Sequence, residues 1–236
     1  MTRLAIMQPY FFPYIGYWQL IRAVDRFVIY DDVNYIKGGW VNRNRVLVNG
    51  EVVYLTVPLD HASPFRRICD TRLAPARPWR EKLVRTIELA YRRAPCFDEV
   101  YPFVADLVRH ETDSLSEYLV HQLRTIAAFL GIRTEFVPSS RAYGNAALAA
   151  QARVVDICRR EGADTYVNAS GGQALYDAGT FRGAGIDLRF IAMRPIPYAQ
   201  RSAAFVPSLS IIDALMALGA AGIRPHLEAY DLREAA

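Results

Sequence analysis

Apolar and polar positions along this chain predict strands and helices in alternation. Leu4–Met7 is a short apolar run that stops at Gln8-Pro9, and Phe27–Tyr30 is a second compact apolar run. Between them, Tyr14–Val24 carries apolar residues at helical spacing. A strand, a helix and a second strand at this distance make a βαβ unit, which predicts two parallel strands joined by a right-handed crossover.

A hairpin and a helical section interrupt this alternation. Asn49-Gly50 lies between the β-rich runs Arg45–Val48 and Val52–Val57, and this dipeptide is the strongest short-range hairpin signal. Two later stretches repeat apolar positions with the period of a helix: Trp79–Arg93 and Ser114–Leu130. We therefore expect a mainly helical section over about residues 78–131.

The alternation of strands and helices returns after this section. The pattern predicts strands at Thr134–Val137, Thr165–Val167 and Leu188–Ala192. It predicts helices at Ala146–Glu161, Gly172–Phe181 and Leu209–Leu218. The expected fold class is thus α/β, with a doubly wound, mainly parallel sheet to which the hairpin and the helical section are attached. We see no internal repeat or long linker, so we expect residues 1–236 to form a single domain.

The composition narrows the classes of function. Lys and Arg outnumber Asp and Glu by 28 to 24, and the basic residues occur as scattered pairs without one long run. Such pairs are typical of solvated surfaces, so nucleic acid is not an expected partner. A nucleic-acid-binding module remains a third hypothesis that draws only on the basic isoelectric point and the aromatic content.

The cysteines and the apolar runs indicate a cytoplasmic location, and the histidines give no sign of a metal site. Cys69, Cys96 and Cys158 lie far apart and match neither a disulfide framework nor a zinc site. The four histidines have no metal-ligand spacing, so we expect no metal site. The first apolar run is too short for the core of a signal peptide. Uncharged apolar stretches elsewhere are all shorter than the roughly 18 residues that a membrane span needs. We expect a cytoplasmic protein without a membrane span.

The first candidate cluster, Gln8–Tyr17, follows the first predicted strand, and ligands of parallel sheets bind at the carboxyl ends of the strands. Its aromatic rings can stack on a planar ligand, and Gly16 permits a close approach near the helix start. The alternative is an aromatic loop that only fills the core. The candidate ligand-binding residues of this cluster are Gln8, Phe12, Gly16 and Tyr17.

The second cluster follows the second strand and holds both signs of charge within fourteen positions. Asp31 or Asp32 can act as a general base, bind a hydroxyl or hold a metal ion. Lys37 and Arg43 suit anionic oxygens. Burying such a cluster costs free energy, so a buried cluster favours a role in ligand binding or catalysis. The alternative is an ion-paired loop at the surface. The amide side chains here are further candidates for ligand binding: Asn34, Asn42 and Asn44.

Two later stretches add candidates. Asn168–Gln173 joins a strand to a predicted helix, and a diglycine at a helix N-terminus exposes N–H groups to a phosphate or carboxylate. A plain turn is the alternative, because the stretch is neither a P-loop nor a dinucleotide fingerprint. Ser208 suits the N-cap of the last strong helix, and Asp213 either faces a site or lies on the wet side of that helix. The candidates here are Gly171, Gly172, Gln173, Tyr176, Ser210 and Asp213.

Seven motifs in one order carry a family resemblance: Gln8–Tyr17, Asp31–Lys37, Trp40–Asn44, Leu55–Leu59, Ser139-Ser140, Gly171–Tyr176 and Leu209–Asp213. In this order they resemble the WbqC-like family of bacterial proteins. Members are typically encoded beside genes for surface polysaccharides or specialised metabolites, so the resemblance implies a biosynthetic role without supplying a reaction. Asn34 stands where the family usually has Gln, and Gly38 where a basic residue is common, so substrate contacts would differ here.

The opening of the chain is also similar to that of pantothenate synthetase and the nucleotidyltransferase group. The similarity is in the order of a strand, a loop, Gly16-Tyr17, a helix, Asp25 and a second strand. In that group a His-x-x-His-type motif binds ATP phosphates, whereas Tyr17 replaces the final histidine here. The resemblance implies a nucleotidyltransferase-like fold and leaves ATP or another nucleotide open as a cofactor.

Our leading hypothesis is a transferase or ligase-like enzyme of a surface-polysaccharide or specialised-metabolite pathway, with a small, anionic, nucleotide- or phosphate-bearing activated metabolite as substrate. Asp32 is the expected general base with Asp31 as its competitor, and Lys37, Arg43 and the diglycine neutralise anionic oxygens. The alternative is a non-catalytic protein that binds a sugar nucleotide or a partner enzyme. The enzyme hypothesis requires that these loops meet in one polar hollow.

Overall fold

The computed structural model describes residues 1–75, 78–194 and 196–235. A six-stranded sheet has the order β10-β9-β8-β1-β2-β7, in which β10 is antiparallel to β9 and the other neighbours are parallel. Its strands are β1 (Arg3–Met7), β2 (Arg26–Ile29), β7 (Glu135–Val137), β8 (Thr165–Ala169), β9 (Asp187–Met193) and β10 (Tyr230–Glu234). The prediction of an α/β fold with a mainly parallel sheet is confirmed.

The strand order follows a doubly wound path. Counted along the chain, the six strands of this sheet lie in the order 3-2-1-4-5-6, which is the order of the doubly wound nucleotide-binding sheets. The chain moves outward from β1 through β2 to β7 and then returns to place β8 on the other side of β1. The loops after β1 and β8 therefore flank the point at which the direction of winding reverses.

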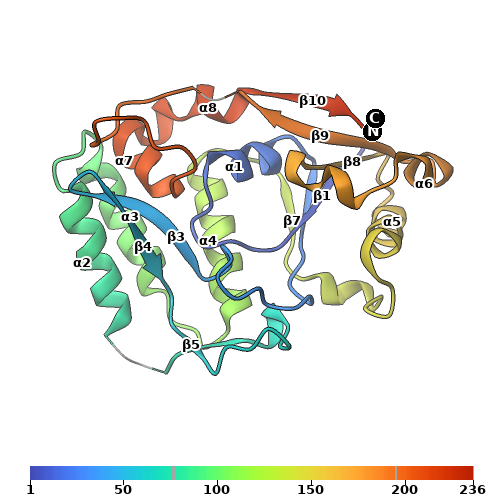
Figure 1. The fold of residues 1–236 in the computed structure, drawn as a ribbon, viewed down its shortest axis with the longest axis horizontal. Coiled ribbons are helices and arrows are strands. Elements are labelled where there is room, and N and C mark those ends of the chain that lie inside the picture. The colour runs from blue at the N-terminus through green and yellow to red at the C-terminus, as the bar shows by residue number, and fades with distance from the viewer. Residues whose placement is uncertain (76–77, 195, 236) are drawn as a thin grey trace.

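Helices cover both faces of the sheet, because successive strand residues point to opposite faces. Ala5 and Phe27 pack on one face, whereas Leu4, Ile6 and Val28 pack on the other. The hydrophobic core on the first face includes residues of α1 (Ile15–Arg22), α2 (Trp79–Tyr91), α3 (Phe97–Arg109), α4 (Leu115–Phe129), α7 (Ile211–Gly222) and α8 (Arg224–Glu228), and the core on the second face includes residues of α5 (Ala150–Arg160) and α6 (Ala178–Gly183). Figure 1 shows α2, α3 and α4 together, on the opposite side of the molecule from α5 and α6.

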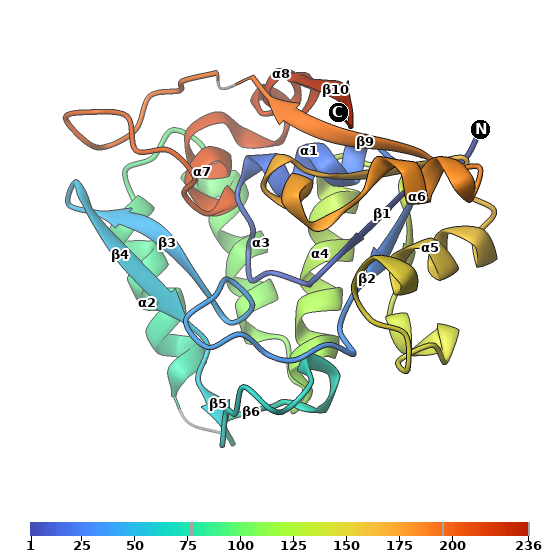
Figure 2. The ribbon, with the colours of Figure 1, turned by 45° about the vertical axis from the view of Figure 1, so that its right-hand side comes forward.

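The predicted hairpin is present as β3 (Arg43–Val48) and β4 (Glu51–Thr56), which pair in antiparallel fashion. Asn49 and Gly50 between them have φ values of 53° and 85°, the positive values that a two-residue hairpin turn of this kind requires. Figure 2 shows the hairpin next to α2 and outside the central sheet. A second, shorter pair consists of β5 (Leu59–Asp60) and β6 (Arg72–Leu73).

The predicted helix over Gly172–Phe181 is wrong. A 3-10 helix, η3 (Ser170–Leu175), comes first, and the chain is extended at Tyr176 before α6 begins. The cause is local, because the diglycine disfavours helix and Asp177 caps a new one by accepting from Thr180 N–H at 2.7 Å. The last strong helix likewise has Ser210, and not Ser208, as its N-cap.

Candidate functional site

The polar clusters lie where the parallel strands end. Because β1, β2, β7 and β8 run in the same direction, the residues that follow them reach one edge of the sheet. Asp31 follows β2 and Ser139 follows β7, and these two strands are neighbours. The edge therefore brings together segments that are about 110 residues apart in the chain.

Asp31 is held by two serine hydroxyls from different elements. Its side chain is only 2% exposed, and Oδ1 accepts a hydrogen bond from Ser139 Oγ at 2.7 Å. Oδ2 accepts from Ser116 Oγ at 2.5 Å, and Ser116 lies in the first turn of α4. A carboxylate at this position is favoured by the positive end of the helix dipole.

Asp32 is enclosed by other partners. Its Oδ2 is 2.5 Å from Nη2 of Arg153 in α5, and both side chains are almost completely buried. Ser140 donates its hydroxyl to Oδ1 of the same carboxylate. Arg153 is also fixed by Asn145, which accepts from its Nε at 2.9 Å, and by the ring of Tyr30 beneath its guanidinium. Asp32 thus joins the loop after β2 to α5.

The two dipeptides pair residue by residue. Ser139 binds Asp31 on the side of α4, whereas Ser140 binds Asp32 on the side of α5. For the acids, the split continues the alternation of side chains along β2, whose consecutive residues point to opposite faces of the sheet. One acid pair therefore supplies two carboxylates with different surroundings.

A cavity of about 380 Å³ opens beside Asp31. Burial, together with the charge of Asp31, raises the pKa of the Cys69 thiol to about 11, so this thiol is protonated at neutral pH and is not a nucleophile. Arg141 is an exposed cation on the wall, where it can contact an anionic ligand. The lining residues are Asp31, Cys69, Ser114, Ser116, Glu117, Val120, Pro138, Ser139 and Arg141.

The asparagines at the start of the hairpin hold backbone. Asn42 donates to the carbonyl of Val57 at 2.8 Å and accepts from Tyr35 Oη at 2.7 Å. Asn44 donates its amide group to the carbonyls of Phe11 and Phe12. Both side chains are buried, so these contacts tie the hairpin to the loop after β1.

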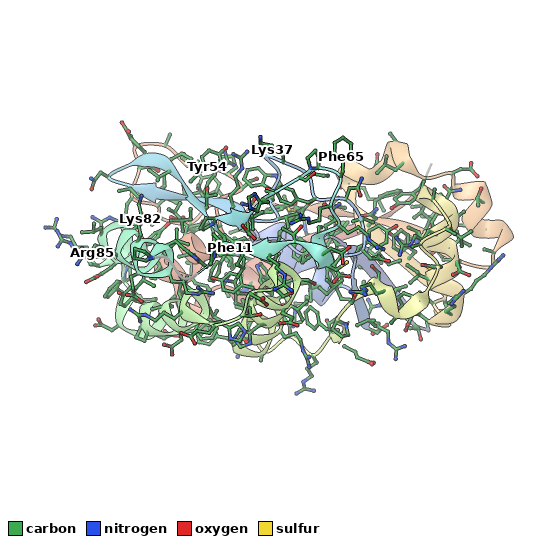
Figure 3. The ribbon with its side chains drawn as sticks, turned by 90° about the horizontal axis from the view of Figure 1, so that it is seen from below. Phe11, Lys37, Tyr54, Phe65, Lys82 and Arg85 are labelled. Carbon is green, nitrogen blue, oxygen red and sulfur yellow. The ribbon has the colours of Figure 1, made fainter. Side chains whose placement is uncertain are left out.

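The single polar hollow that the enzyme hypothesis requires is not formed by the described residues, because neither the cations of the second cluster nor the diglycine lines the Asp31 cavity. Arg43 Nε donates to Gly39 O at 3.3 Å, Nη2 donates to Gly38 O, and the guanidinium lies 4.6 Å from the centre of the Tyr54 ring. Lys37 is exposed, and Figure 3 shows it pointing outward. Asn34 is exposed and forms an isolated backbone bridge with Arg67 in the neighbouring loop.

The first cluster divides between the core and a second cavity. The rings of Phe12 and Tyr17 are at most 2% exposed and belong to the main core, which is the arrangement expected of an aromatic loop that fills the interior. Tyr17 donates its hydroxyl to the backbone carbonyl of half-buried Gln8 at 2.8 Å. Gly16 lines a cavity of about 90 Å³ that shares no lining residue with the Asp31 cavity.

The diglycine lies within η3 and therefore does not start an α-helix. A Cβ on Gly172 would be 2.8 Å from Asn168 Nδ2, so this position needs glycine for a close approach of side chain to backbone. Gln173 is exposed, and Tyr176 Oη lies 3.3 Å from Tyr166 Oη. These residues follow β8, next to the point at which the winding of the sheet reverses.

The last pair of candidates has structural partners. Ser210 donates to the carbonyl of Phe12 at 2.9 Å and accepts from Ile212 N–H, as an N-cap does. Asp213 is 4% exposed, and its two oxygens accept from Tyr91 Oη at 2.9 Å and Tyr198 Oη at 2.8 Å. Burial raises the pKa of Asp213, although both hydroxyls act in the opposite direction. The carboxylate is therefore not on the wet side of the helix, which was one of its two expected positions.

Several residues of the Asp31 region were not among the predicted candidates. Ser139-Ser140 had a signal, because this dipeptide follows a predicted strand as the acid pair does. Ser116 and Arg153 had none, since they reach the acid pair from 85 and 121 residues away along the chain.

In the described part of the chain, no group of three or more His, Cys, Asp or Glu side chains is arranged to hold a metal ion. In the same part, every helix is too short or too polar to cross a membrane.

Comparisons with known proteins give one family and one curated relative. Residues 8–225 match the WbqC-like protein family. A protein of Mycobacterium tuberculosis with the name "Uncharacterized protein Rv1507c" is 29% identical over 225 residues, which cover 93% of this chain and 95% of that protein. No solved structure matches the chain at a significant level.

Proposed function

The chain belongs to the WbqC-like protein family, and from this premise we propose that it is a biosynthetic enzyme that transfers or ligates a group on a small activated metabolite. The proposed substrate carries a nucleotide or another phosphate group and belongs to a surface-polysaccharide or specialised-metabolite pathway. The proposal does not rest on one hollow shared by all the candidates. The observation that carries it is that Asp31, a buried carboxylate held by two serines, lines an open cavity at the carboxyl edge of the sheet.

Asp31 is the proposed general base. It takes the proton of an acceptor hydroxyl or amine as that atom attacks the activated group, and the two serine hydroxyls orient the carboxylate. Arg141 on the same wall stabilises the negative charge that develops on the leaving group. Asp32 is proposed to position Asp31, because its pairing with Arg153 fixes the loop that carries both acids.

The nucleotide or phosphate part is proposed to bind between the loops after β1 and β8. The strand order supports this place, because doubly wound sheets bind nucleotides where the winding reverses. Gln8 lies on one side of that point and Gly171, Gly172 and Gln173 lie on the other. A nucleotidyltransferase-like arrangement of ligand and sheet is therefore part of the proposal, as is Lys37 as a cation that contacts the anionic substrate from the loop after β2.

A ligand screen followed by one substitution tests the proposal. Nucleotides, sugar nucleotides and acyl or aminoacyl donors are added to the purified protein, and a ligand at 100 times its Kd raises the free energy of unfolding by about 2.7 kcal/mol. For each ligand that binds, turnover is then measured with a set of hydroxyl and amine acceptors. We expect Asp31→Asn to keep ligand binding and to lower kcat by about 10²- to 10⁴-fold, the usual share of a general base.

Asp106→Asn is the matched control, because Asp106 is an exposed carboxylate on α3. Its kcat should equal that of the unmodified protein. Ligand binding without any turnover would favour the alternative, a non-catalytic protein that binds a sugar nucleotide. Full turnover by Asp31→Asn would remove Asp31 from the reaction.

A further inference from the structure

The cavity that Gly16 lines is mainly apolar. It lies between α1, the end of β9, α8 and the segment 196–209, and its volume is about 90 Å³. Gly16 has no side chain, and Met193 packs over it, since a Cβ there would lie 1.9 Å from the Met193 sulfur. A flexible thioether wall can adapt to the shape of a small guest. Further apolar walls come from Ile15, Ile196, Phe205 and Leu209.

A buried amide faces this space. Gln19 is 2% exposed and lines the cavity. Its Nε2 donates to the carbonyl of His226 at 2.6 Å and to the carbonyl of Ala229 at 3.1 Å. Because both partners are acceptors, they fix which end of the amide is the NH₂ group. Within the described part of the chain, the other end, Oε1, accepts no hydrogen bond. A buried acceptor without a donor is costly, so a bound donor at this position would stabilise the protein.

The interior of the cavity offers no charge to an ionic guest. Burial lowers the pKa of His226, so its imidazole is neutral at pH 7. The hydroxyl of Tyr198 already donates to Asp213 and is therefore engaged. Arg194 is exposed and lies 3.7 Å from Asp231, with which it pairs. An ammonium or carboxylate group would lose its hydration here without gaining a partner.

We propose that this cavity binds a short apolar group that ends in a neutral N–H or O–H, which donates a hydrogen bond to Gln19 Oε1. A volume of 90 Å³ is close to the share of about three water molecules in the liquid, and a guest of about five heavy atoms fits because bonded atoms lie closer together than separate waters. The amide of a short acyl chain has both features, with its alkyl end on the apolar walls and its N–H on Gln19. The site is independent of the Asp31 cavity and of the reaction proposed there.

Saturation-transfer NMR with the full chain tests the site. Propionamide and propionate have the same shape, but propionate carries a charge and offers no N–H. We expect propionamide to bind with a Kd in the millimolar range and propionate to bind at least fivefold more weakly. Equal binding of the two probes would overturn the proposal, and so would the absence of propionamide binding.

Two substitutions locate the binding. Ile196→Trp fills the cavity from a residue that is 40% exposed, and we expect it to weaken propionamide binding at least tenfold. Leu175→Trp is the matched control, because Leu175 is 69% exposed on η3, and it should leave binding unchanged. Unchanged binding by Ile196→Trp would overturn the proposal.

Gln19→Leu removes the acceptor but also the two bonds to backbone carbonyls, so circular dichroism must first show that this variant folds. A folded Gln19→Leu should bind propionamide at least fivefold more weakly, and unchanged propionamide binding would count against Gln19 as the acceptor. If Gln19→Leu does not fold, the result with Ile196→Trp decides. Asp31→Asn should bind propionamide normally, so failure of this site and failure of the proposed reaction can be told apart.

Discussion

Asp31 and Asp213 are both buried carboxylates that accept two hydroxyl hydrogen bonds, yet their surroundings differ. Asp31 receives two serines and lines a cavity. Asp213 receives two tyrosines, and its pKa is raised by burial. The small serine side chains leave space in front of one carboxylate, whereas the phenol rings occupy the space around the other. The size of the donors, and not their number, separates a carboxylate that lines a cavity from one that is enclosed by rings.

The largest effect on stability is expected at Asp32. This carboxylate is held by a guanidinium, whereas serine hydroxyls hold Asp31 and tyrosine hydroxyls hold Asp213. Arg153→Met leaves this carboxylate buried without its charge partner, and we expect a loss of about 3 to 5 kcal/mol in the free energy of unfolding. Urea denaturation measures the loss. Arg159→Met is the control, because Arg159 is exposed on the same helix. A loss below about 1 kcal/mol together with abolished turnover would instead make Asp32 the reactive acid and break the comparison.

A smaller effect is expected at Asp213. Tyr91→Phe removes one of its two donors and should cost about 1 to 3 kcal/mol. Because folding raises the pKa of Asp213, the stability that this group contributes is complete below its ordinary pKa of 3.8 and is lost as pH rises through the folded value. The hydroxyl stabilises the ionised form, so the cost of Tyr91→Phe should grow as the pH rises through that pKa.

Denaturation at several pH values checks this prediction. Tyr54→Phe is the control, because Tyr54 is half exposed on the hairpin. Its effect should be small at every pH. A cost of Tyr91→Phe that stays constant across the pH range would show that Asp213 stays protonated, and the two carboxylates would then differ in charge as well as in access.

The smallest effect on stability is expected at Lys37. Lys37→Ala should change the free energy of unfolding by less than about 0.5 kcal/mol, because the side chain is exposed. If the loop after β2 contacts an anionic substrate, the same variant lowers turnover. Lys82→Ala on α2 is the matched control, and Figure 3 shows both lysines at the surface. Equal turnover in the two variants would limit the reaction to the residues that line the Asp31 cavity.

Local patterns were sufficient to predict much of the fold. Short apolar runs identified the parallel strands, and Asn49-Gly50 identified the hairpin. The helix predicted over Gly172–Phe181 is wrong because the cap at Asp177 starts a new helix in the middle of the periodic stretch. The acid pair was placed at the correct edge, since parallel strands end together. The partners of each acid could not be predicted, because Ser116 and Arg153 reach them only through tertiary packing.

The pairing of Asp31-Asp32 with Ser139-Ser140 makes the site sensitive to chain length in one short stretch. Deleting or inserting a single residue between Ile29 and the acids would exchange their directions, so that the carboxylate now facing α4 would face α5. The one residue between Ile29 and Asp31 therefore fixes which acid faces which helix. A protein engineer who wished to move the proposed base to the other face could therefore attempt it by changing the count of residues and leaving their identity alone.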